Sequence, residues 1–158
     1  MKGKHVVPAD DNIREHIRVI LERQFDESIG DFISTRNSLS VELSPRTGRL
    51  KYVFVDGNRI LTLRASDGWF TITTMFAKLV NEGLGAFFNK VVIESGIDLK
   101  GSLLAPGVVD CDTNIRPGDE VVLVDEEGKL VGVGRAKMSC DAMKTSLKGE
   151  AVRVRETV

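Results

Sequence analysis

Apolar residues recur every three or four positions near the start of the chain, which is the pattern of an amphipathic helix. With a period of 3.6 residues, these positions form one stripe along the helix, and the charged residues between them face solvent. Asp10, Asp11 or Asn12 can cap the helix, because each side chain can accept a hydrogen bond from a free amide of the first turn. The positions of the stripe are Ile13, Ile17, Ile20, Leu21 and Phe25.

The next part of the chain alternates apolar and polar residues, which predicts a meander of half-buried β-strands. Asp56-Gly57 is a strong signal for a tight hairpin turn between two of them. A short helix follows, with Thr73 or Thr74 as its N-cap and Gly83 as its C-cap. The strands are expected at about residues 39–43, 50–55, 60–63 and 69–70.

The pattern changes at Gly83-Leu84-Gly85, beyond which short apolar runs are separated by glycine turns. Short strands at regular spacing are typical of a small barrel. We therefore expect an α+β chain of two domains. Residues 1–85 would form a small α/β meander domain and residues 86–158 a β pseudobarrel. The strands of the second domain are expected at about residues 91–93, 108–111, 120–124, 130–135 and 152–155.

The overall charge excludes a globally basic nucleic-acid binder, because 22 Lys and Arg face 23 Asp and Glu, for a net charge of −1. The charges are segregated, however. Residues 36–64 and residues 135–155 each hold six basic and two acidic residues, whereas residues 110–127 hold one basic and seven acidic residues. Arg153 and Arg155 alternate with valines, so one face of the last strand is expected to be basic. Such a surface can attract a polyanion.

The motifs of catalytic and cofactor sites are incomplete. Ser95 lacks the preceding glycine of a nucleophile elbow, and only His5 and His16 could supply an imidazole base. The segment Gly132-Val133-Gly134 lacks the third glycine and the helix of a dinucleotide-binding loop. Glycines inside a strand more often mark bulges or barrel corners. We expect no catalytic constellation, no metal site and no cofactor.

Cys111 and Cys140 lie far apart in the sequence, with no second cysteine pair and no nearby histidine. This pattern argues against a disulfide scaffold, a zinc site and a redox pair, and favours two small buried thiols in a reducing cytoplasm. Residues 1–11 develop no apolar stretch of the kind found in signal peptides. No run approaches the ~18 apolar residues of a membrane span. We therefore expect a cytoplasmic protein without a membrane partner.

Four motifs of the second half, taken in order, resemble a PUA domain, the RNA-binding pseudobarrel named for pseudouridine synthases and archaeosine transglycosylases. The resemblance runs from about Lys90 to Arg155. The helix that usually precedes the first motif is expected to be short here, within residues 95–101, and the RNA groove of the family lies beside it. The four motifs are Leu103–Val108, Arg116–Val121, Gly132–Ala136 and Gly149–Val152.

The first half resembles the domain that precedes PUA in archaeal tRNA-guanine (archaeosine) transglycosylases. More loosely, it resembles the pre-PUA domain of translation re-initiation factors such as ligatin. The segments that carry the resemblance are Val53–Gly57 and Leu63–Thr71. In transglycosylases this pair of domains presents tRNA to a separate catalytic barrel. That barrel has no counterpart in this sequence, so we expect a stand-alone, non-catalytic protein.

The resemblance implies a non-enzymatic protein of RNA modification or translation that binds tRNA or another structured RNA, and no DNA. The A-form helix hides its base edges, so contacts to the backbone are expected. Glycines would admit a close approach of RNA, and cations would neutralise phosphates. Each glycine could equally serve only to turn the barrel. The expected RNA-binding residues are Lys100, Gly101, Ser102, Gly107, Arg135, Lys137, Arg153 and Arg155.

Two other functions compete with this one. The first is a protein-binding adaptor, or an accessory subunit of a tRNA-modifying enzyme or of the small ribosomal subunit. The pairs Trp69-Phe70 and Phe87-Phe88 could anchor such a partner if exposed, or belong to the core. The second is a small enzyme that uses Asp67 or Asp119, both of which stand beside glycines. Neither aspartate has an obvious partner in the sequence, so the enzyme ranks last.

Overall fold

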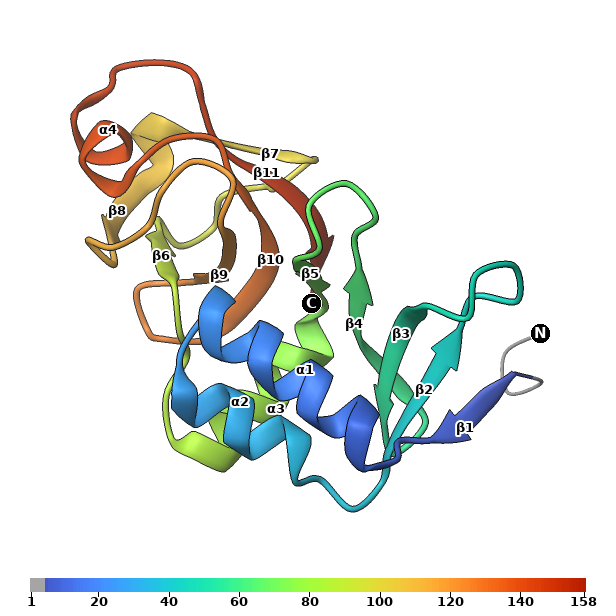
Figure 1. The fold of residues 1–158 in the computed structure, drawn as a ribbon. Coiled ribbons are helices and arrows are strands. Elements are labelled where there is room, and N and C mark those ends of the chain that lie inside the picture. The colour runs from blue at the N-terminus through green and yellow to red at the C-terminus, as the bar shows by residue number, and fades with distance from the viewer. Residues whose placement is uncertain (1–4) are drawn as a thin grey trace. The chain divides into compact units, whose positions relative to one another are not determined.

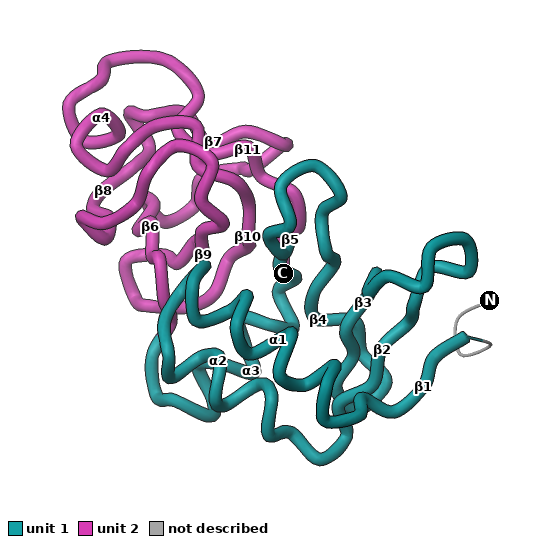
Figure 2. Tube along the Cα trace, viewed as in Figure 1, with its two compact units in different colours: residues 1–86 teal, residues 87–158 magenta. Residues whose placement is uncertain are grey.

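The computed structural model describes residues 5–158, and the chain divides after Ala86 into two compact units (Figures 1 and 2). Unit 1 ends at Ala86 and unit 2 begins at Phe87. Residues 1–4, on which part of the signal-peptide prediction rests, lie outside the described residues. No helix among the described residues is both long and apolar enough to cross a membrane.

Two helices follow the first strand of unit 1. Helix α1 (Asp11–Gln24) follows the predicted apolar stripe, and the carboxylate of Asp10 accepts a hydrogen bond from the amide of Ile13 at 2.8 Å. Asp10 is therefore the N-cap among the three predicted candidates. Helix α2 (Glu27–Ser34) was not predicted, because its eight residues hold too few turns for a clear period. The Asp26 carboxylate caps it in the same way, accepting from the amide of Ile29 at 2.8 Å.

The sheet of unit 1 is an antiparallel meander in which each strand pairs with the next along the chain. The predicted meander is present, and one further strand, β1, was not predicted. All five strands are joined in sequence order, as Figure 1 shows. The strands are β1 (Val6–Pro8), β2 (Leu39–Leu43), β3 (Leu50–Val55), β4 (Asn58–Leu63) and β5 (Phe70–Ile72).

The two faces of this sheet differ in composition. In the register, Val41 lies opposite Val53, Val53 opposite Leu61 and Leu61 opposite Ile72, and all four side chains are buried. Helices α1, α2 and α3 gather on one side of the sheet (Figure 1) and add further buried residues to the core. Residues between these positions point to the other face, which therefore carries the polar and aromatic side chains of β2, β3 and β4.

Helix α3 (Thr74–Leu84) begins where the Thr73 hydroxyl accepts a hydrogen bond from the amide of Phe76 at 3.2 Å, so Thr73 is the N-cap. The prediction that Gly83 ends the helix was wrong. Gly85 is the C-cap, with a φ of 80° that favours glycine. Gly83 lies within the helix because it packs against a ring. A Cβ at this position would stand 2.0 Å from Cζ of Phe32.

Unit 2 is a curled six-stranded sheet with the order β7-β11-β10-β9-β6-β8. Its strands include all those predicted, and β7 is an addition. A 3₁₀ turn (Ala105–Gly107) and helix α4 (Cys140–Thr145) connect them. No helix forms within residues 95–101, where a short one was expected. The strands are β6 (Lys90–Ile93), β7 (Ser102–Leu104), β8 (Val108–Cys111), β9 (Glu120–Val124), β10 (Leu130–Ala136) and β11 (Glu150–Thr157).

The glycines of β10 sit where the backbones of neighbouring strands come too close for a side chain. A Cβ on Gly134 would lie 2.3 Å from the carbonyl oxygen of Arg153, and one on Gly132 would lie 2.5 Å from that of Glu156. The register of β10 against β11 shifts between Val133 and Gly134. The predicted bulge is therefore present. The glycines allow β10 and β11 to approach more closely than residues with a side chain would.

Cys111 and Cys140 form a disulfide, so the prediction of two free thiols was wrong. Strand β8 ends at Cys111 and α4 begins at Cys140, which brings their Cα atoms to 5.8 Å despite a sequence separation of 29. The expected burial is correct for both residues. Disulfides persist in oxidising compartments and in intracellular proteins of hyperthermophiles. The cysteines therefore give no support to a reducing cytoplasm.

Candidate nucleic-acid interface

A row of four polar residues crosses the sheet of unit 2, one from each of the strands β7, β11, β10 and β9. Three of them are predicted RNA-binding residues, and the fourth is Glu120. Ser102 lies opposite Arg153, Arg153 opposite Arg135 and Arg135 opposite Glu120. Residues directly opposite each other in antiparallel strands point to the same face, with Cβ atoms about 5 Å apart. We call these four residues the cross-strand row. Ser102, Arg153 and Arg135 are exposed, whereas Glu120 is buried.

The opposite face of β11 is apolar, as the alternation of arginine and valine predicts. Val152 and Val154 are buried in the core of unit 2, whereas Arg153 and Arg155 point away from it. The fold therefore brings the predicted arginines of β11 and Arg135 of β10 to one surface. Two arginines directly opposite each other repel, so their position requires negative charge nearby.

Glu150 supplies part of that charge. Its carboxylate accepts hydrogen bonds from Nε of Arg153 at 2.8 Å and from Nη2 at 3.0 Å, and also from the hydroxyl of Ser102. The Arg153 hydrogen bonds, followed by the Ser102 hydrogen bond, lower the pKa of Glu150 from 4.5 to about 2. The same interaction raises the pKa of Arg153. Because Arg153 is exposed, this pair can open toward a competing anion.

The Glu150–Arg153 pair depends on an irregularity in β11. Residues three apart in a regular strand point to opposite faces. The register against β7 shifts between Glu150 and Val152, which inserts one extra residue and returns Glu150 to the face of Arg153. No local pattern in the sequence marks this shift, so the carboxylate that neutralises Arg153 was not predicted.

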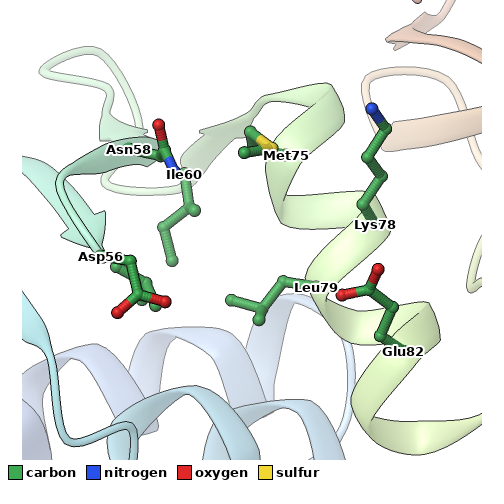
Figure 3. Close-up of a pocket in the computed structure, with 8 residues that line it drawn as sticks. Asp56, Asn58, Ile60, Met75, Lys78, Leu79 and Glu82 are labelled. Carbon is green, nitrogen blue, oxygen red and sulfur yellow. The ribbon is translucent and has the colours of Figure 1, made fainter.

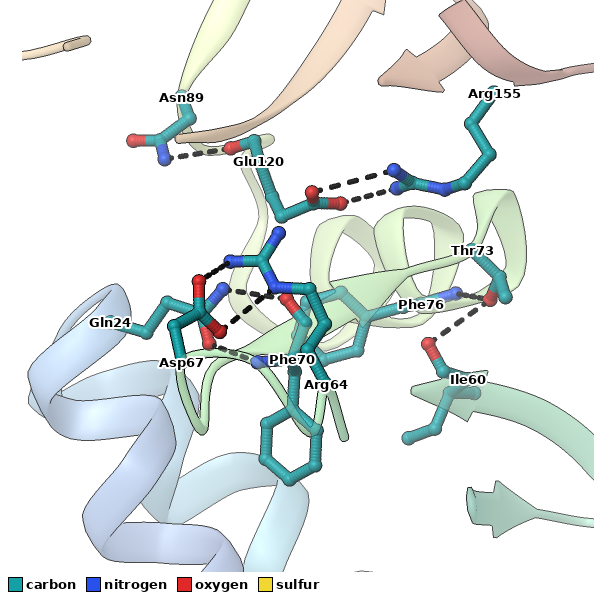
Figure 4. Close-up of polar contacts among 10 residues, drawn as sticks. All are labelled: Gln24, Ile60, Arg64, Asp67, Phe70, Thr73, Phe76, Asn89, Glu120 and Arg155. Carbon is teal, nitrogen blue, oxygen red and sulfur yellow. Dashed lines mark hydrogen bonds and ion pairs between the residues drawn. The ribbon is translucent and has the colours of Figure 1, made fainter. Parts of the chain in front are cut away.

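Arg155 is engaged more deeply. Its guanidinium forms a two-pronged ion pair with the Glu120 carboxylate (Figure 4), and the Glu120 side chain is fully buried while that of Arg155 is 34% exposed. A buried carboxylate needs a partner, because transfer from water into the protein interior is costly. Arg155 therefore neutralises a buried carboxylate. The predicted contact of Arg155 with RNA would require this ion pair to break.

Arg135 and Lys137 are the predicted cations with the greatest freedom. Both side chains are exposed, and neither forms an ion pair within residues 5–158. Lys137 acts on Glu150 only through a distant electrostatic attraction, the weakest cause that lowers the pKa of that carboxyl. These two residues can therefore neutralise phosphates without breaking an existing contact.

The segment before β7 adds backbone and a further cation. Gly101 has a φ of 85°, its carbonyl accepts a hydrogen bond from the amide of Val154 at 2.9 Å, and nothing lies within 4 Å of the place of a Cβ. A ligand could therefore approach its backbone. Lys100 is 84% exposed and pairs with Asp98 at 3.4 Å. These residues adjoin Ser102, at the end of the cross-strand row.

Gly107, in contrast, has a packing function. A Cβ there would stand 2.7 Å from Cδ1 of Ile97 and 3.2 Å from Cδ1 of Leu103. Ile97 and Leu103 belong to or pack against the core of unit 2. The lack of a side chain thus lets the 3₁₀ turn close over that core, as the alternative interpretation of the glycines holds. A contact of Gly107 with RNA remains a prediction.

Residues that the sequence suggested for a protein-binding adaptor or for a small enzyme also have contacts within the protein. Phe70 is fully buried, and its backbone amide and carbonyl are both bound by the Gln24 side chain at 2.8 Å (Figure 4). It belongs to the core and does not anchor a partner. Asp67 pairs with Arg64 at 3.0 Å, and Asp119 accepts a hydrogen bond from the amide of Arg116 at 2.9 Å. Both aspartates therefore stabilise turns.

Unit 1 also contains a hollow of about 270 Å³ between the β3–β4 hairpin and α3 (Figure 3). Ile60, Leu79 and Met75 form its apolar part, and Met75 is 40% exposed. Asp56 and Glu82 supply carboxylates at its edge. Within the described part of the chain, no group of three or more His, Cys, Asp and Glu residues could hold a metal ion.

Comparisons with known proteins agree with the division into two units. Residues 89–158 match the model of the PUA domain, and residues 15–86 match that of the patch-forming domain C2 of tRNA-guanine transglycosylase. A PUA domain from Aeropyrum pernix K1 has the same fold, with a TM-score of 0.63 at 19% identity. The comparison covers 96% of this chain and 85% of that one.

Two curated relatives show where such a pair of domains occurs. The tRNA-guanine(15) transglycosylase of Methanosphaera stadtmanae is 32% identical over 87% of this chain and 21% of its own length. The archaeosine synthase subunit alpha of Thermococcus kodakarensis is 31% identical over 91% of this chain and 23% of its own length. The chain spans a little over a fifth of the length of these two relatives. Residues 15–86 thus belong to the C2 domain family of tRNA-guanine transglycosylases, and residues 89–158 are a PUA domain.

Proposed function

We propose that this chain is a non-catalytic RNA-binding protein that holds tRNA, or another structured RNA, for modification. The observation that carries the proposal is the cross-strand row of the PUA domain. It presents Arg135 and Arg153 side by side on an exposed sheet face next to the open backbone of Gly101. The names of the relatives, a tRNA-guanine(15) transglycosylase and an archaeosine synthase subunit, support tRNA as the RNA.

The geometry favours the backbone of a duplex as the ligand. The groups that this face offers to an anion are guanidinium, ammonium and hydroxyl groups, beside the carboxylates of Glu120 and Glu150. No aromatic side chain belongs to the row. Such groups recognise phosphates and ribose hydroxyls, which an A-form helix displays, and they do not read base identity. Arg135 and Lys137 would bind phosphates directly, and Arg153 would exchange Glu150 for a phosphate. Arg155 would bind a phosphate only by leaving the carboxylate of Glu120.

Binding of a tRNA transcript to the Arg153→Ala variant tests this function. We expect weaker binding and a shallower dependence of log affinity on log salt, with the slope reduced by about 0.9 for one lost phosphate contact. Lys129→Ala is the matched control, because Lys129 is exposed and lies at the opposite end of β10 from Arg135. Equal affinities and slopes for the two variants would remove Arg153 from the site.

A second candidate function is an accessory subunit that docks on a protein. The half-exposed Met75 at the apolar hollow of unit 1 favours it, because exposed methionines are frequent at adaptable binding surfaces. The partner would be a tRNA-modifying enzyme or the small ribosomal subunit. Pull-down from a native extract with and without nuclease distinguishes the functions. Partners lost with nuclease indicate RNA, and partners that survive indicate protein.

A further inference from the structure

The hairpins of unit 1 carry a second group of cations, arranged around the single tyrosine of the chain. Arg46 and Arg49 lie in the turn between β2 and β3, Lys51 and Tyr52 lie on β3, and Arg59 lies on β4. All four cationic side chains are exposed, and Tyr52 is partly buried. We call these five residues the hairpin patch.

The tyrosine ring holds two of the cations. Nζ of Lys51 and the guanidinium carbon of Arg59 each lie 5.1 Å from the ring centre, within the range of a cation–π attraction. The ring of Phe54 meets Tyr52 edge-on, with centroids 6.4 Å apart. Phe54 is buried, so it anchors the tyrosine to the sheet. The patch therefore combines an aromatic ring that Phe54 anchors with exposed positive charge.

None of the four cations forms an ion pair with any residue of the described chain. The acid nearest in the register is Glu42, which lies opposite Tyr52 on β2 and is partly buried. Counting this carboxylate, the patch keeps a net charge of +3. Unpaired positive charge of this density needs solvent ions or an anionic ligand.

The same sheet face offers groups that can accept and donate hydrogen bonds. Tyr52 lies opposite Thr62, and Thr62 lies opposite Thr71. Both threonines are partly buried, and they share the face that lies opposite the buried side chains of Val53 and Leu61. This face therefore carries polar and aromatic groups. These are the groups with which β-sheets bind unpaired nucleotides.

We propose that the hairpin patch binds an unpaired stretch of RNA, with one base stacked on Tyr52 and the adjoining phosphates bound by the four cations. The proposal rests on the proposed function and extends it, because the row on the PUA domain fits the backbone of a duplex and lacks an aromatic ring. On binding, the base replaces a cation on the Tyr52 ring. That cation moves to a phosphate, which neutralises a charge that has no ion pair in the free protein.

Because Tyr52 is the only tyrosine, 3-fluorotyrosine labelling of the full chain gives one fluorine NMR resonance that reports on the patch. The probe is a short RNA oligonucleotide without self-complementarity. Inorganic polyphosphate and polyglutamate serve as anions without bases. We expect the RNA to shift the resonance upfield through ring stacking and polyphosphate to shift it much less. An equal response to RNA and polyphosphate, or a response to polyglutamate alone, would overturn the proposal.

Affinity for the same oligonucleotide gives a second measurement. Tyr52→Ala should lower it about tenfold, the loss expected from one stacked base, and Tyr52→Phe should preserve it. Arg59→Ala should weaken binding, whereas Arg23→Ala should not. Arg23 is also an exposed cation, but it lies on α1, on the helical side of the sheet. Thermal unfolding of each variant excludes loss of the fold as the cause. Wild-type affinity in Tyr52→Ala would contradict the proposal.

The two proposals fail separately. If Tyr52→Ala binds the oligonucleotide normally while Arg153→Ala loses tRNA, the hairpin patch is wrong and the PUA surface is right. If Arg153→Ala and Arg135→Ala bind tRNA normally while Tyr52→Ala loses the oligonucleotide, the patch is right and the PUA surface is wrong. If the wild-type chain binds neither RNA, both are overturned.

Discussion

The arginines of β11 and the cations of the hairpin patch look alike in the sequence but differ in their internal contacts. Arg153 is bound by Glu150, and Arg155 is bound by the buried Glu120. Arg59 and Lys51, in contrast, rest on the Tyr52 ring, and no carboxylate of the described chain pairs with them. A count of charges therefore overestimates the positive charge that β11 can offer to RNA. Availability to a ligand depends on the partner of each cation.

Loss of the disulfide should have the largest effect, because it should destabilise unit 2 and leave unit 1 unchanged. The Cys111–Cys140 disulfide closes a loop of about 30 residues in unit 2, and chain-entropy arguments give such a loop about 3–4 kcal/mol. We expect Cys111→Ser with Cys140→Ser to lower the free energy of unfolding of unit 2 by that amount. Hydrogen exchange by mass spectrometry measures this unit by unit. Equal loss of protection in unit 1 would contradict the assignment.

Arg155→Ala should have the next largest effect, on stability. It removes the two-pronged partner of a fully buried carboxylate, a change that costs about 3–5 kcal/mol for a wholly buried pair. We expect about 2–3 kcal/mol, because the Arg155 side chain is 34% exposed. Denaturant unfolding gives the value. Arg59→Ala, its counterpart in the hairpin patch, should stay within about 0.5 kcal/mol of wild type.

Glu150→Gln should raise the affinity for tRNA. The substitution removes the negative charge that holds Arg153, and the guanidinium then meets a phosphate without first losing an ion pair. We expect an increase of about fivefold, corresponding to ~1 kcal/mol. Titration by fluorescence anisotropy measures it. A decrease would mean that Glu150 positions Arg153 for RNA instead of competing with it.

The smallest expected effect is that of pH on the Glu150–Arg153 ion pair and on tRNA binding. Since the pKa of Glu150 is lowered to about 2, the Glu150–Arg153 pair contributes its full stability above the ordinary pKa of 4.5, and that stability is lost as the pH falls through about 2. Protonation of Glu150 should therefore leave tRNA binding unchanged between about pH 5 and pH 7. Carbon-detected NMR of the Glu150 carboxyl gives the midpoint. A midpoint near 4.5 would show that the pair does not persist in solution.

Much of the fold follows from local patterns in the sequence. The stripe of Ile13, Ile17 and Leu21 predicts α1, and the alternation of arginine and valine predicts the two faces of β11. Gly132 and Gly134 likewise mark a real bulge. These features depend on neighbours within one element or one hairpin, so a period or a turn signal is sufficient.

The predictions from the sequence fail where segments that are far apart in the chain come into contact. The disulfide requires β8 and α4 to approach across 29 positions, and Gly83 is inside a helix because the ring of Phe32 occupies the space of its side chain. The pairing of Arg155 with Glu120 spans 35 positions, and that of Arg153 with Glu150 requires a register shift. The hairpin patch was visible only as an excess of charge, because the packing of Lys51 and Arg59 on Tyr52 depends on tertiary structure.

The salt dependence of tRNA binding by Arg135→Ala is the sharpest test of RNA binding by the cross-strand row, because Arg135 is exposed and forms no ion pair with any described residue. We expect weaker binding and a fall of about 0.9 in the slope of log affinity against log salt. If the affinity and the slope equal those of the wild-type chain, the cross-strand row does not bind the RNA.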